Sequence, residues 1–262
     1  SGVFIDGGSA NFVRGNYIGI RHDGASTLSN GTHGVEIDTS PGNIIGGSTP
    51  GERNIISGNF GDGVQIRGLL TTGGNTVSGN YIGVSPAGNG PYSNFGDGVA
   101  IIASNNTIGG TTAGERNIIS GNNGSGVRTQ GINQGNNVIS GNYIGTDATG
   151  AFHISNINYG VDIRSNNNTI GGTTIGERNI ISGNMGSGVR IEGIGVSGNT
   201  VSCNYIGTDA LGTSAMLSFS HGVEITGGND NTIGGPTTAA RNVISGNTGN
   251  GVIIQGNSAT GN

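Results

Sequence analysis

The sequence of 262 residues contains no lysine and no tryptophan, and it has a single cysteine, Cys203. One cysteine cannot form a disulfide within the chain, so the cysteine content does not indicate whether the protein is located in an oxidising or a reducing compartment. Ten scattered arginines accompany fifteen acidic residues, for a net charge of −5, whereas nucleic-acid binding requires clustered positive charge. No apolar run approaches the roughly 20 residues that span a bilayer. We therefore expect neither a nucleic-acid partner nor membrane insertion.

Residues that favour helices are also scarce, with only five leucines. The chain instead has 33 isoleucines, 16 valines, 57 glycines and 35 asparagines. β-branched side chains favour strands, and glycine and asparagine favour tight turns. The composition therefore predicts an all-β protein and disfavours a helical solenoid.

The chain repeats itself every 62 or 63 residues. The segment 43–47, Asn-Ile-Ile-Gly-Gly, returns at 106–110, 168–172 and 231–235 with Thr in place of the first Ile. Each repeat holds two Gly-Val-x-Ile segments, so it is two coils, a short one of 28 or 29 residues and a long one of 32 to 35. A fixed period is typical of a stack of similar units. We expect one domain over residues 1–262, with about eight full coils in four double-coil repeats.

Each coil contains three short β-type segments joined by Gly and Asn turns. The segments 168–184 and 141–150 resemble repeats of right-handed parallel β-helix proteins of the pectate-lyase-like superfamily, in particular those of large bacterial secreted and surface proteins. The resemblance implies a right-handed, three-sided parallel β-helix and an extracellular or cell-surface location. The superfamily includes lyases, hydrolases, epimerases, tailspikes and adhesins, so the resemblance implies no single activity.

Alternation assigns the faces of the Gly-Val-x-Ile strands. The Val and Ile point the same way and should fill the interior, with Thr129 as the one polar residue there. A further column is the Asn that ends each SGN-type motif. We expect these residues to alternate between two edges of the coil and to stabilise turns, with no binding role. They are Asn16, Asn59, Asn80, Asn122, Asn142, Asn184, Asn204 and Asn247.

The outward residue of Gly-Val-x-Ile changes sign from coil to coil. We expect Arg128, Asp162, Arg190 and Glu224 to pair along the rod. The pairs Asp38/Arg67 and Arg164/Glu192 should form one position after the inward Ile.

Two hypotheses apply to this strip. Alternating charges can solvate a sheet and fix the register of the coils. In the enzymes of the superfamily, one outer sheet face carries a polysaccharide cleft, and the resemblance would make these residues catalytic: Arg128, Asp162, Arg190, Glu224, Arg164 and Glu192. Carboxylates interleaved with arginines are poorly arranged for Ca²⁺, which needs several converging oxygens. The structural hypothesis is therefore preferred.

Other candidate groups also repeat. Asp23, Asp147 and Asp209 lie in loops that recur on alternate coils, and the matching segment 84–87 has no Asp. Equivalent atoms of successive loops should be about 9.6 Å apart, so one calcium ion cannot bridge them. We read them as turn formers and expect no cofactor, although Asp147 or Asp209 could hold calcium with backbone carbonyls of its own loop. The Glu-Arg pairs 52–53, 115–116 and 177–178 repeat too faithfully to mark one active site, and Cys203 is read as a tolerated small residue.

The four long loops, 20–33, 84–97, 146–159 and 208–221, differ most between repeats. They should line up along one edge and contain most of the non-repeating aromatic residues. A ligand groove or a lateral association surface would form there, unless the apolar side chains pack against one another.

We predict a secreted or cell-surface β-helix rod, such as a stalk, adhesin-like or filament segment, that contacts glycans or other chains. The alternative is a polysaccharide lyase or hydrolase acting on the outer face from Arg128 to Glu224. An ice-binding solenoid is disfavoured because no outward Thr column is present. Neither end of the sequence has a capping helix, which predicts a fragment or end-to-end association.

Overall fold

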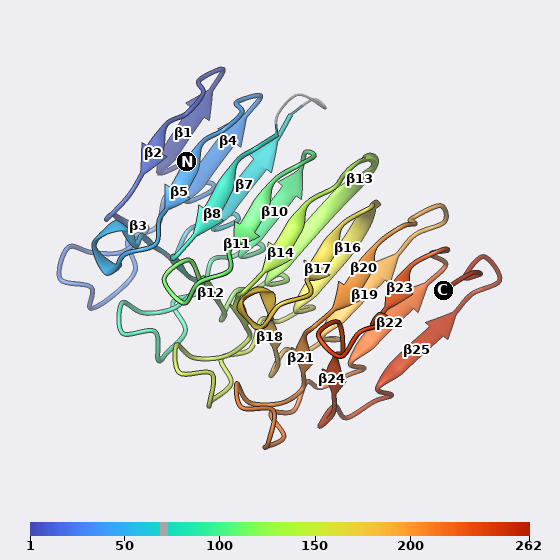
Figure 1. Cartoon of the computed structure of the whole chain (residues 1–262). Coiled ribbons are helices and arrows are strands. Elements are labelled where there is room, and N and C mark those ends of the chain that lie inside the picture. Colours follow the sequence, from blue (N-terminus) through green and yellow to red (C-terminus); the bar gives the residue numbers. More distant parts are fainter. Residues whose placement is uncertain (69–72) are drawn as a thin grey trace.

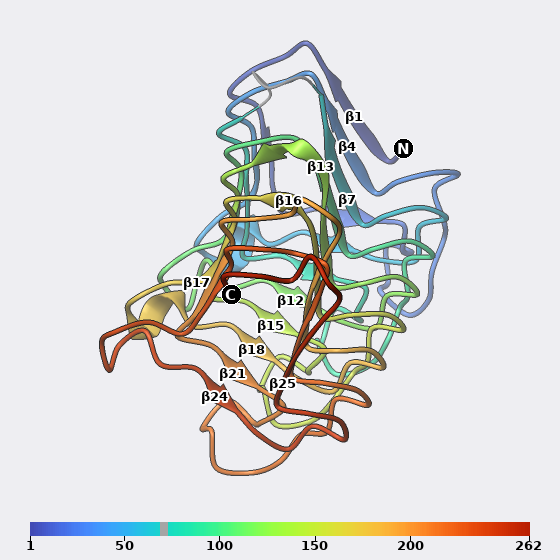
Figure 2. The same ribbon diagram turned by 90° about the vertical axis from the view of Figure 1, so that its right-hand side faces the viewer.

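The computed structural model describes residues 1–68 and 73–262. Over these residues the chain forms three parallel sheets of nine, eight and eight strands, and each coil contributes one strand to each sheet. The coils stack side by side into a rod (Figure 1), and a view turned by 90° shows them superimposed around one interior (Figure 2). The all-β, three-sided parallel β-helix that the sequence predicts is confirmed.

The first sheet holds the Gly-Val-x-Ile segments. Its strands are β1 (Val3–Asp6), β4 (Val35–Asp38), β7 (Val64–Arg67), β10 (Val99–Ile102), β13 (Val127–Gly135), β16 (Val161–Asn166), β19 (Val189–Glu192), β22 (Val223–Thr226) and β25 (Val252–Gln255).

The second and third sheets follow in each coil. The second has β2 (Phe12–Val13), β5 (Ile44–Gly46), β8 (Thr76–Ser78), β11 (Thr107–Gly109), β14 (Val138–Ser140), β17 (Thr169–Gly171), β20 (Thr200–Ser202) and β23 (Thr232–Ile233). The third has β3 (Tyr17–Ile18), β6 (Ile55–Ile56), β9 (Tyr81–Ile82), β12 (Ile118–Ile119), β15 (Tyr143–Ile144), β18 (Ile180–Ile181), β21 (Tyr205–Ile206) and β24 (Val243–Ile244). The helical segments of the described chain are the 3-10 turns η1 (Pro50–Glu52) and η2 (Ile175–Glu177), and no described helix is long enough to cross a membrane.

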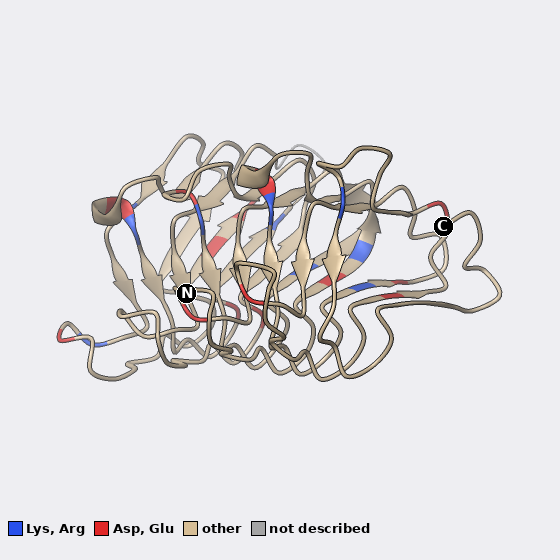
Figure 3. Cartoon of the chain, turned by 60° about the horizontal axis from the view of Figure 1, so that its bottom comes forward, with Lys and Arg blue, Asp and Glu red and all other residues tan. Residues whose placement is uncertain are grey.

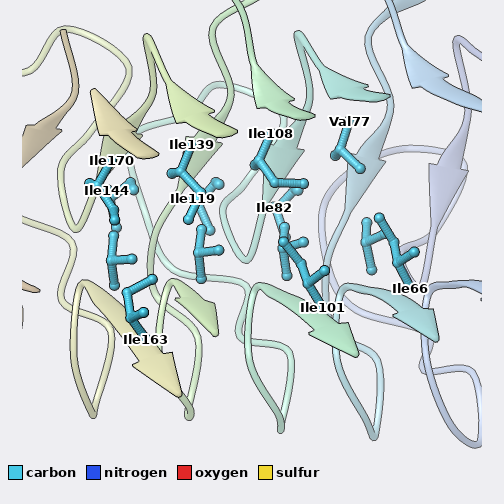
Figure 4. Packing of buried hydrophobic residues seen from close by; sticks show 14 of the residues in the cluster. Ile66, Val77, Ile82, Ile101, Ile108, Ile119, Ile139, Ile144, Ile163 and Ile170 are labelled. Atoms are coloured by element: carbon cyan, nitrogen blue, oxygen red, sulfur yellow. The ribbon is translucent and has the colours of Figure 1, made fainter. Parts of the chain in front are cut away.

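The interior is a stack of β-branched side chains, as the alternation predicts. In the first sheet Val99 pairs with Val64 and Val127, so like residues lie above one another. Figure 4 shows the same arrangement for isoleucines from all three sheets. Thr129 is fully buried among them, and its Oγ1 accepts a hydrogen bond from Ser165 Oγ at 2.8 Å.

The glycine before each of these valines is required by close packing at the corner between the third and first sheets. A Cβ on Gly98 would lie 2.4 Å from Ile119 Cγ2 and 2.6 Å from the Gly126 carbonyl oxygen. No side chain fits in that space, which explains why glycine precedes valine wherever a further coil follows.

Each of the three corners carries a ladder of asparagines. The Nδ2 of one asparagine donates to the Oδ1 of the asparagine in the next coil, as from Asn106 to Asn137 at 3.2 Å. The first ladder, between the first and second sheets, contains Asn11, Asn43, Asn75, Asn106, Asn137, Asn168, Asn199, Asn231 and Asn262. The second, between the second and third sheets, contains Asn16, Asn54, Asn80, Asn117, Asn142, Asn179, Asn204 and Asn242.

The third ladder, between the third and first sheets, is interrupted. It runs through Asn30, Asn59, Asn94, Asn122, Asn156 and Asn184. The next coil has Ser218 at this position. Among the described residues the buried Ser218 Oγ and the Oδ1 of Asn247, one coil further on, have no hydrogen-bond partner.

The SGN asparagines do alternate between two corners, as expected, since they fall in the second and third ladders. The sequence interpretation missed that other asparagines complete these ladders. Together these asparagines form hydrogen-bond networks along the three corners, so they connect successive coils as well as stabilise turns.

Candidate functional site

The outward side chains of the first sheet form a strip that we call the charged face. Strand pairing places Arg128 beside Asp162, Asp162 beside Arg190 and Arg190 beside Glu224. Figure 3 shows acidic and basic positions interspersed along the rod. The register of the candidate residues is therefore the one that the sequence predicts.

The ion pairs along this central column differ from the prediction. Arg128 Nε reaches back to Asp97 Oδ2 at 2.7 Å, while Asp162 Oδ2 accepts from Arg164 Nε at 2.9 Å on its own strand. Arg190 also pairs within its strand, with Glu192. Residues two apart on a strand share a face, and a long arginine side chain reaches them as readily as it reaches the next coil.

The other predicted pairs are confirmed. Arg67 Nη2 lies 2.8 Å from Asp38 Oδ2, and Arg164 Nη2 lies 3.2 Å from Glu192 Oε2. Glu224, the last member of the central column, has no ion pair among the described residues and accepts a hydrogen bond from Ser187 Oγ at 2.7 Å.

A further column on this face was missed by the sequence interpretation. It is the residue immediately before the Gly of each Gly-Val, and it brings Asp62, Asp97 and Tyr159 to the charged face. Aligning the coils on Gly-Val would have found it. Its members from β4 to β22 are His33, Asp62, Asp97, Ser125, Tyr159, Ser187 and His221.

Asp62 and Asp97 join successive coils through backbone hydrogen bonds. Asp62 Oδ1 accepts the amide N–H of Asp97, and Asp97 Oδ1 accepts that of Ser125, both at 2.7 Å. The amide N–H of Asp62 donates to His33 Nδ1 at 3.0 Å. An Nδ1 atom that accepts this hydrogen bond carries a lone pair and no proton. The 3.4 Å contact between His33 Nδ1 and Asp62 Oδ2 is therefore not an ion pair.

Burial raises the pKa of two carboxyl groups of this face, those of Asp97 and Asp162. It raises the pKa of Asp97 to about 6, although Arg128 opposes the shift. It also raises the pKa of Asp162 against the attraction of Arg164.

Two buried atoms near the middle of the face have no hydrogen-bond partner within the described chain, Asp162 Oδ1 and Arg190 Nε. The Arg190 guanidinium lies 4.7 Å from the centroid of the Tyr159 ring. A carboxyl group with a pKa of about 6, as at Asp97, can exchange protons near neutral pH. Over residues 1–68 and 73–262, no three His, Cys, Asp or Glu side chains converge into a metal-binding group.

The loop aspartates cap their own turns. Asp147 Oδ1 accepts the amide N–H of Ala151 at 3.0 Å, and Asp209 Oδ1 accepts that of Thr213 at 2.8 Å. These hydrogen bonds support the turn-forming hypothesis, and the use of Asp147 or Asp209 for calcium stays a prediction.

The repeated Glu-Arg pairs also have a structural role. Glu52 Oε2 accepts hydrogen bonds from the amides of Ser48 and Thr49 and from Thr49 Oγ1, at 3.0 to 3.1 Å. Arg53 lies 4.1 Å over the ring of Tyr81 in the next coil. The same stacking recurs for Arg116 on Tyr143 and Arg178 on Tyr205.

Cys203 is buried, and its Sγ lies 3.2 Å from the Thr174 carbonyl oxygen. Its φ of +64° matches the +71° of Gly79 and Gly141 at the equivalent positions. The residue therefore replaces a glycine in a left-handed turn, as the sequence suggests, and is closed to solvent.

The long loops extend from one edge of the rod on every second coil (Figure 1). Ile154 and Met216 pack inward, whereas Phe95, Phe152 and Phe219 are at least half exposed. Two grooves lie between successive loops. One, of about 390 Å³, is lined by Asn89, Pro91, Ser93, Gly121, Asn123, His153, Ile154, Ser155 and Ile157. The other, of about 250 Å³, is lined by Ala151, Phe152, His153, Ala215, Met216, Leu217 and Phe219. The inward packing that the sequence analysis considers is therefore present for Ile154 and Met216, whereas a ligand groove or an association surface at these loops stays a prediction.

The sequence matches no protein-family model and no curated protein. Among solved structures it is similar to a PL6 alginate lyase in complex with a trisaccharide, at 13% identity and a TM-score of 0.37 over 89% of this chain and 56% of that one. It is also similar to the A-module of a mannuronan C-5 epimerase from Azotobacter vinelandii, at 15% identity and a TM-score of 0.25 over 97% and 90% of the two chains. The chain thus spans a little over half the length of that lyase. By its own sheet topology, the chain is a parallel β-helix protein.

Proposed function

We propose that the chain is a structural rod, a stalk or filament segment of a secreted or cell-surface protein. The observation that carries this proposal is the use of polar side chains for stacking. Asparagine ladders join the coils at all three corners, and most acidic and basic residues of the charged face bind one another or the backbone. Such a molecule holds its ends a fixed distance apart and presents long repetitive surfaces.

Electron microscopy and labelling of the parent protein test this proposal. On intact cells, an antibody against the chain should bind without permeabilisation, and purified particles should be straight rods whose length grows with the number of repeats. Labelling only after permeabilisation, or compact particles of constant size, would overturn the proposal.

A second candidate is a polysaccharide lyase or hydrolase acting across the charged face. The specific observation in its favour is the pair of buried carboxyl groups with raised pKa values, Asp97 and Asp162, on either side of Arg128. This candidate requires turnover of an acidic polysaccharide that Asp162→Ala and Arg190→Ala abolish while the circular dichroism spectrum stays unchanged. Activity that survives both substitutions would exclude this face as the site.

A further inference from the structure

An exposed apolar column runs along the corner between the third and first sheets. It is formed by the residue that follows each position of the third ladder, including Ser218, so consecutive members lie about 4.8 Å apart. The rings of Phe60 and Phe95 are neighbours in it, with centroids 5.4 Å apart. From the coil of β7 to the coil of β22 its members are Phe60, Phe95, Asn123, Ile157, Met185 and Phe219, and all but Asn123 are large and 47–59% exposed.

The long loops make the surface beside this column a series of ridges and grooves. Long loops precede β4, β10, β16 and β22, whereas the coils between them have only short connections. The 390 Å³ groove has loops 84–97 and 146–159 as its walls and the short connection at Gly121 and Asn123 as its floor. The 250 Å³ groove lies in the same way between loops 146–159 and 208–221. Ridges and grooves alternate every coil, about 4.8 Å apart.

The exposed apolar area is large enough for a stable interface. The column and the long loops together present eight large apolar side chains that are 47–71% exposed: Leu28, Phe60, Phe95, Phe152, Ile157, Met185, Leu217 and Phe219. At roughly 200 Å² for a fully exposed side chain of this size, they contribute about 900 Å². That is close to one partner's share of a standard protein interface, about 800 Å².

We propose that this corner binds a second copy of the chain in a lateral, antiparallel dimer, with its two-fold axis between Asn123 and Ile157. This axis sets Phe95 against the partner's Met185 and Phe60 against the partner's Phe219. It also carries each long loop onto a short connection of the other copy. Loop 84–97 then enters the groove between loops 146–159 and 208–221.

The alternation of loops selects the antiparallel arrangement. A parallel pair in register would place each loop on its own equivalent and each groove opposite a groove. A parallel pair shifted by one coil would fit, but it would not close and would continue as a filament. The antiparallel pair alone is both closed and interdigitated.

Sedimentation equilibrium of the purified chain tests the surface. The wild type should dimerise, and Phe95→Ser with Met185→Ser should weaken dimerisation about 100-fold or more, because both copies lose two central anchors. The matched control is Ile175→Ser with Ile194→Ser, which removes two side chains of 79% and 81% exposure elsewhere on the rod. The control should dimerise as the wild type does. A wild type that stays monomeric at about 0.1 mM, or an equal effect of both double variants, would overturn the proposal.

Cysteine crosslinking tests the direction of the two chains. Gly31 and Thr248 extend the column at its two ends, and a Cβ at Gly31 meets no atom within 4 Å. In the antiparallel dimer, Gly31→Cys of one copy lies against Thr248→Cys of the other, while the only native thiol is buried. Mild oxidation of a mixture of the two variants should give a covalent heterodimer, and each variant alone should give none. A covalent homodimer of either variant, or no crosslink in the mixture, would contradict this arrangement.

Discussion

Restoring the interrupted asparagine ladder should stabilise the rod. Ser218 keeps the register of its asparagine equivalents, because the Phe219 amide donates to the Asn184 carbonyl oxygen at 2.9 Å and the Thr248 amide donates to the Ser218 carbonyl oxygen at 3.1 Å. In Ser218→Asn the new Nδ2 would therefore face Asn247 Oδ1, which has no partner in the described chain.

The gain can be estimated from the intact part of the ladder. There the Nδ2 of Asn122 donates to Asn156 Oδ1 at 2.9 Å, and its backbone amide donates to the same oxygen at 3.1 Å. The substitution should create two or three buried hydrogen bonds of about 1 kcal/mol each. Ordering the longer side chain costs part of this. We expect a net stabilisation of about 1–3 kcal/mol.

Hydrogen exchange is the suitable assay, because a solenoid can open coil by coil and a single melting temperature then mixes several steps. The amides of Phe219 and Thr248 should exchange about 5- to 150-fold more slowly in Ser218→Asn. Ser218→Asp is the matched control, since its carboxylate has the same shape but cannot donate to Asn247. Unchanged or faster exchange in Ser218→Asn, or an equal slowing in Ser218→Asp, would refute the reasoning.

Three further predictions concern the core, the buried carboxyl group and the ion pairs. Gly98→Ala should destabilise the chain by about 1–3 kcal/mol in urea unfolding, because the new Cβ would overlap Ile119 and the Gly126 carbonyl. The control is Gly90→Ala, whose Cβ meets no atom within 4 Å and whose stability should stay within about 0.5 kcal/mol of the wild type. The folded pKa of Asp97, about 6, exceeds the 3.8 of a free side chain. The stabilisation that the protonated Asp97 carboxyl provides is thus fully present below about pH 3.8 and is lost as the pH rises through 6. Asp97→Asn should therefore remove up to about 3 kcal/mol of the pH dependence of unfolding across that window. An unchanged pH profile would contradict the raised pKa of Asp97. Arg164→Ala should cost about 1–3 kcal/mol in the same urea assay, because the substitution leaves the Asp162 carboxyl, whose side chain is 2% exposed, without its partner. A loss below about 0.5 kcal/mol would show that the pair behaves as an exposed one.

The fold could be predicted because one pattern repeats. The Gly-Val-x-Ile segments fix both the buried columns and the register, so the positions of Arg128, Asp162 and Arg190 relative to one another follow from the sequence. The ladders were not predicted, since the SGN motif reveals one asparagine per coil and these were interpreted as turn formers. The partners that complete the second and third ladders, such as Asn54 and Asn94, lie outside that motif.

The contacts of the candidate site were less predictable. Register places an arginine beside several acidic residues at similar distances, and packing decides which one it binds. Arg128 binds Asp97, which belongs to the column of residues before Gly-Val that the sequence interpretation missed. For the long loops, the sequence locates the edge but cannot tell that Ile154 turns inward while Phe152 turns outward, because both are apolar and irregularly spaced.

The most direct test of the structural function is turnover by the wild-type chain. Alginate, polygalacturonate and neutral polysaccharides would be incubated with the protein, with and without Ca²⁺, and unsaturated uronate and new reducing ends would be measured. We predict that every polymer remains intact, because the acidic and basic side chains of the charged face serve the stack. Product that forms with the wild type and disappears with Asp162→Ala would contradict this account.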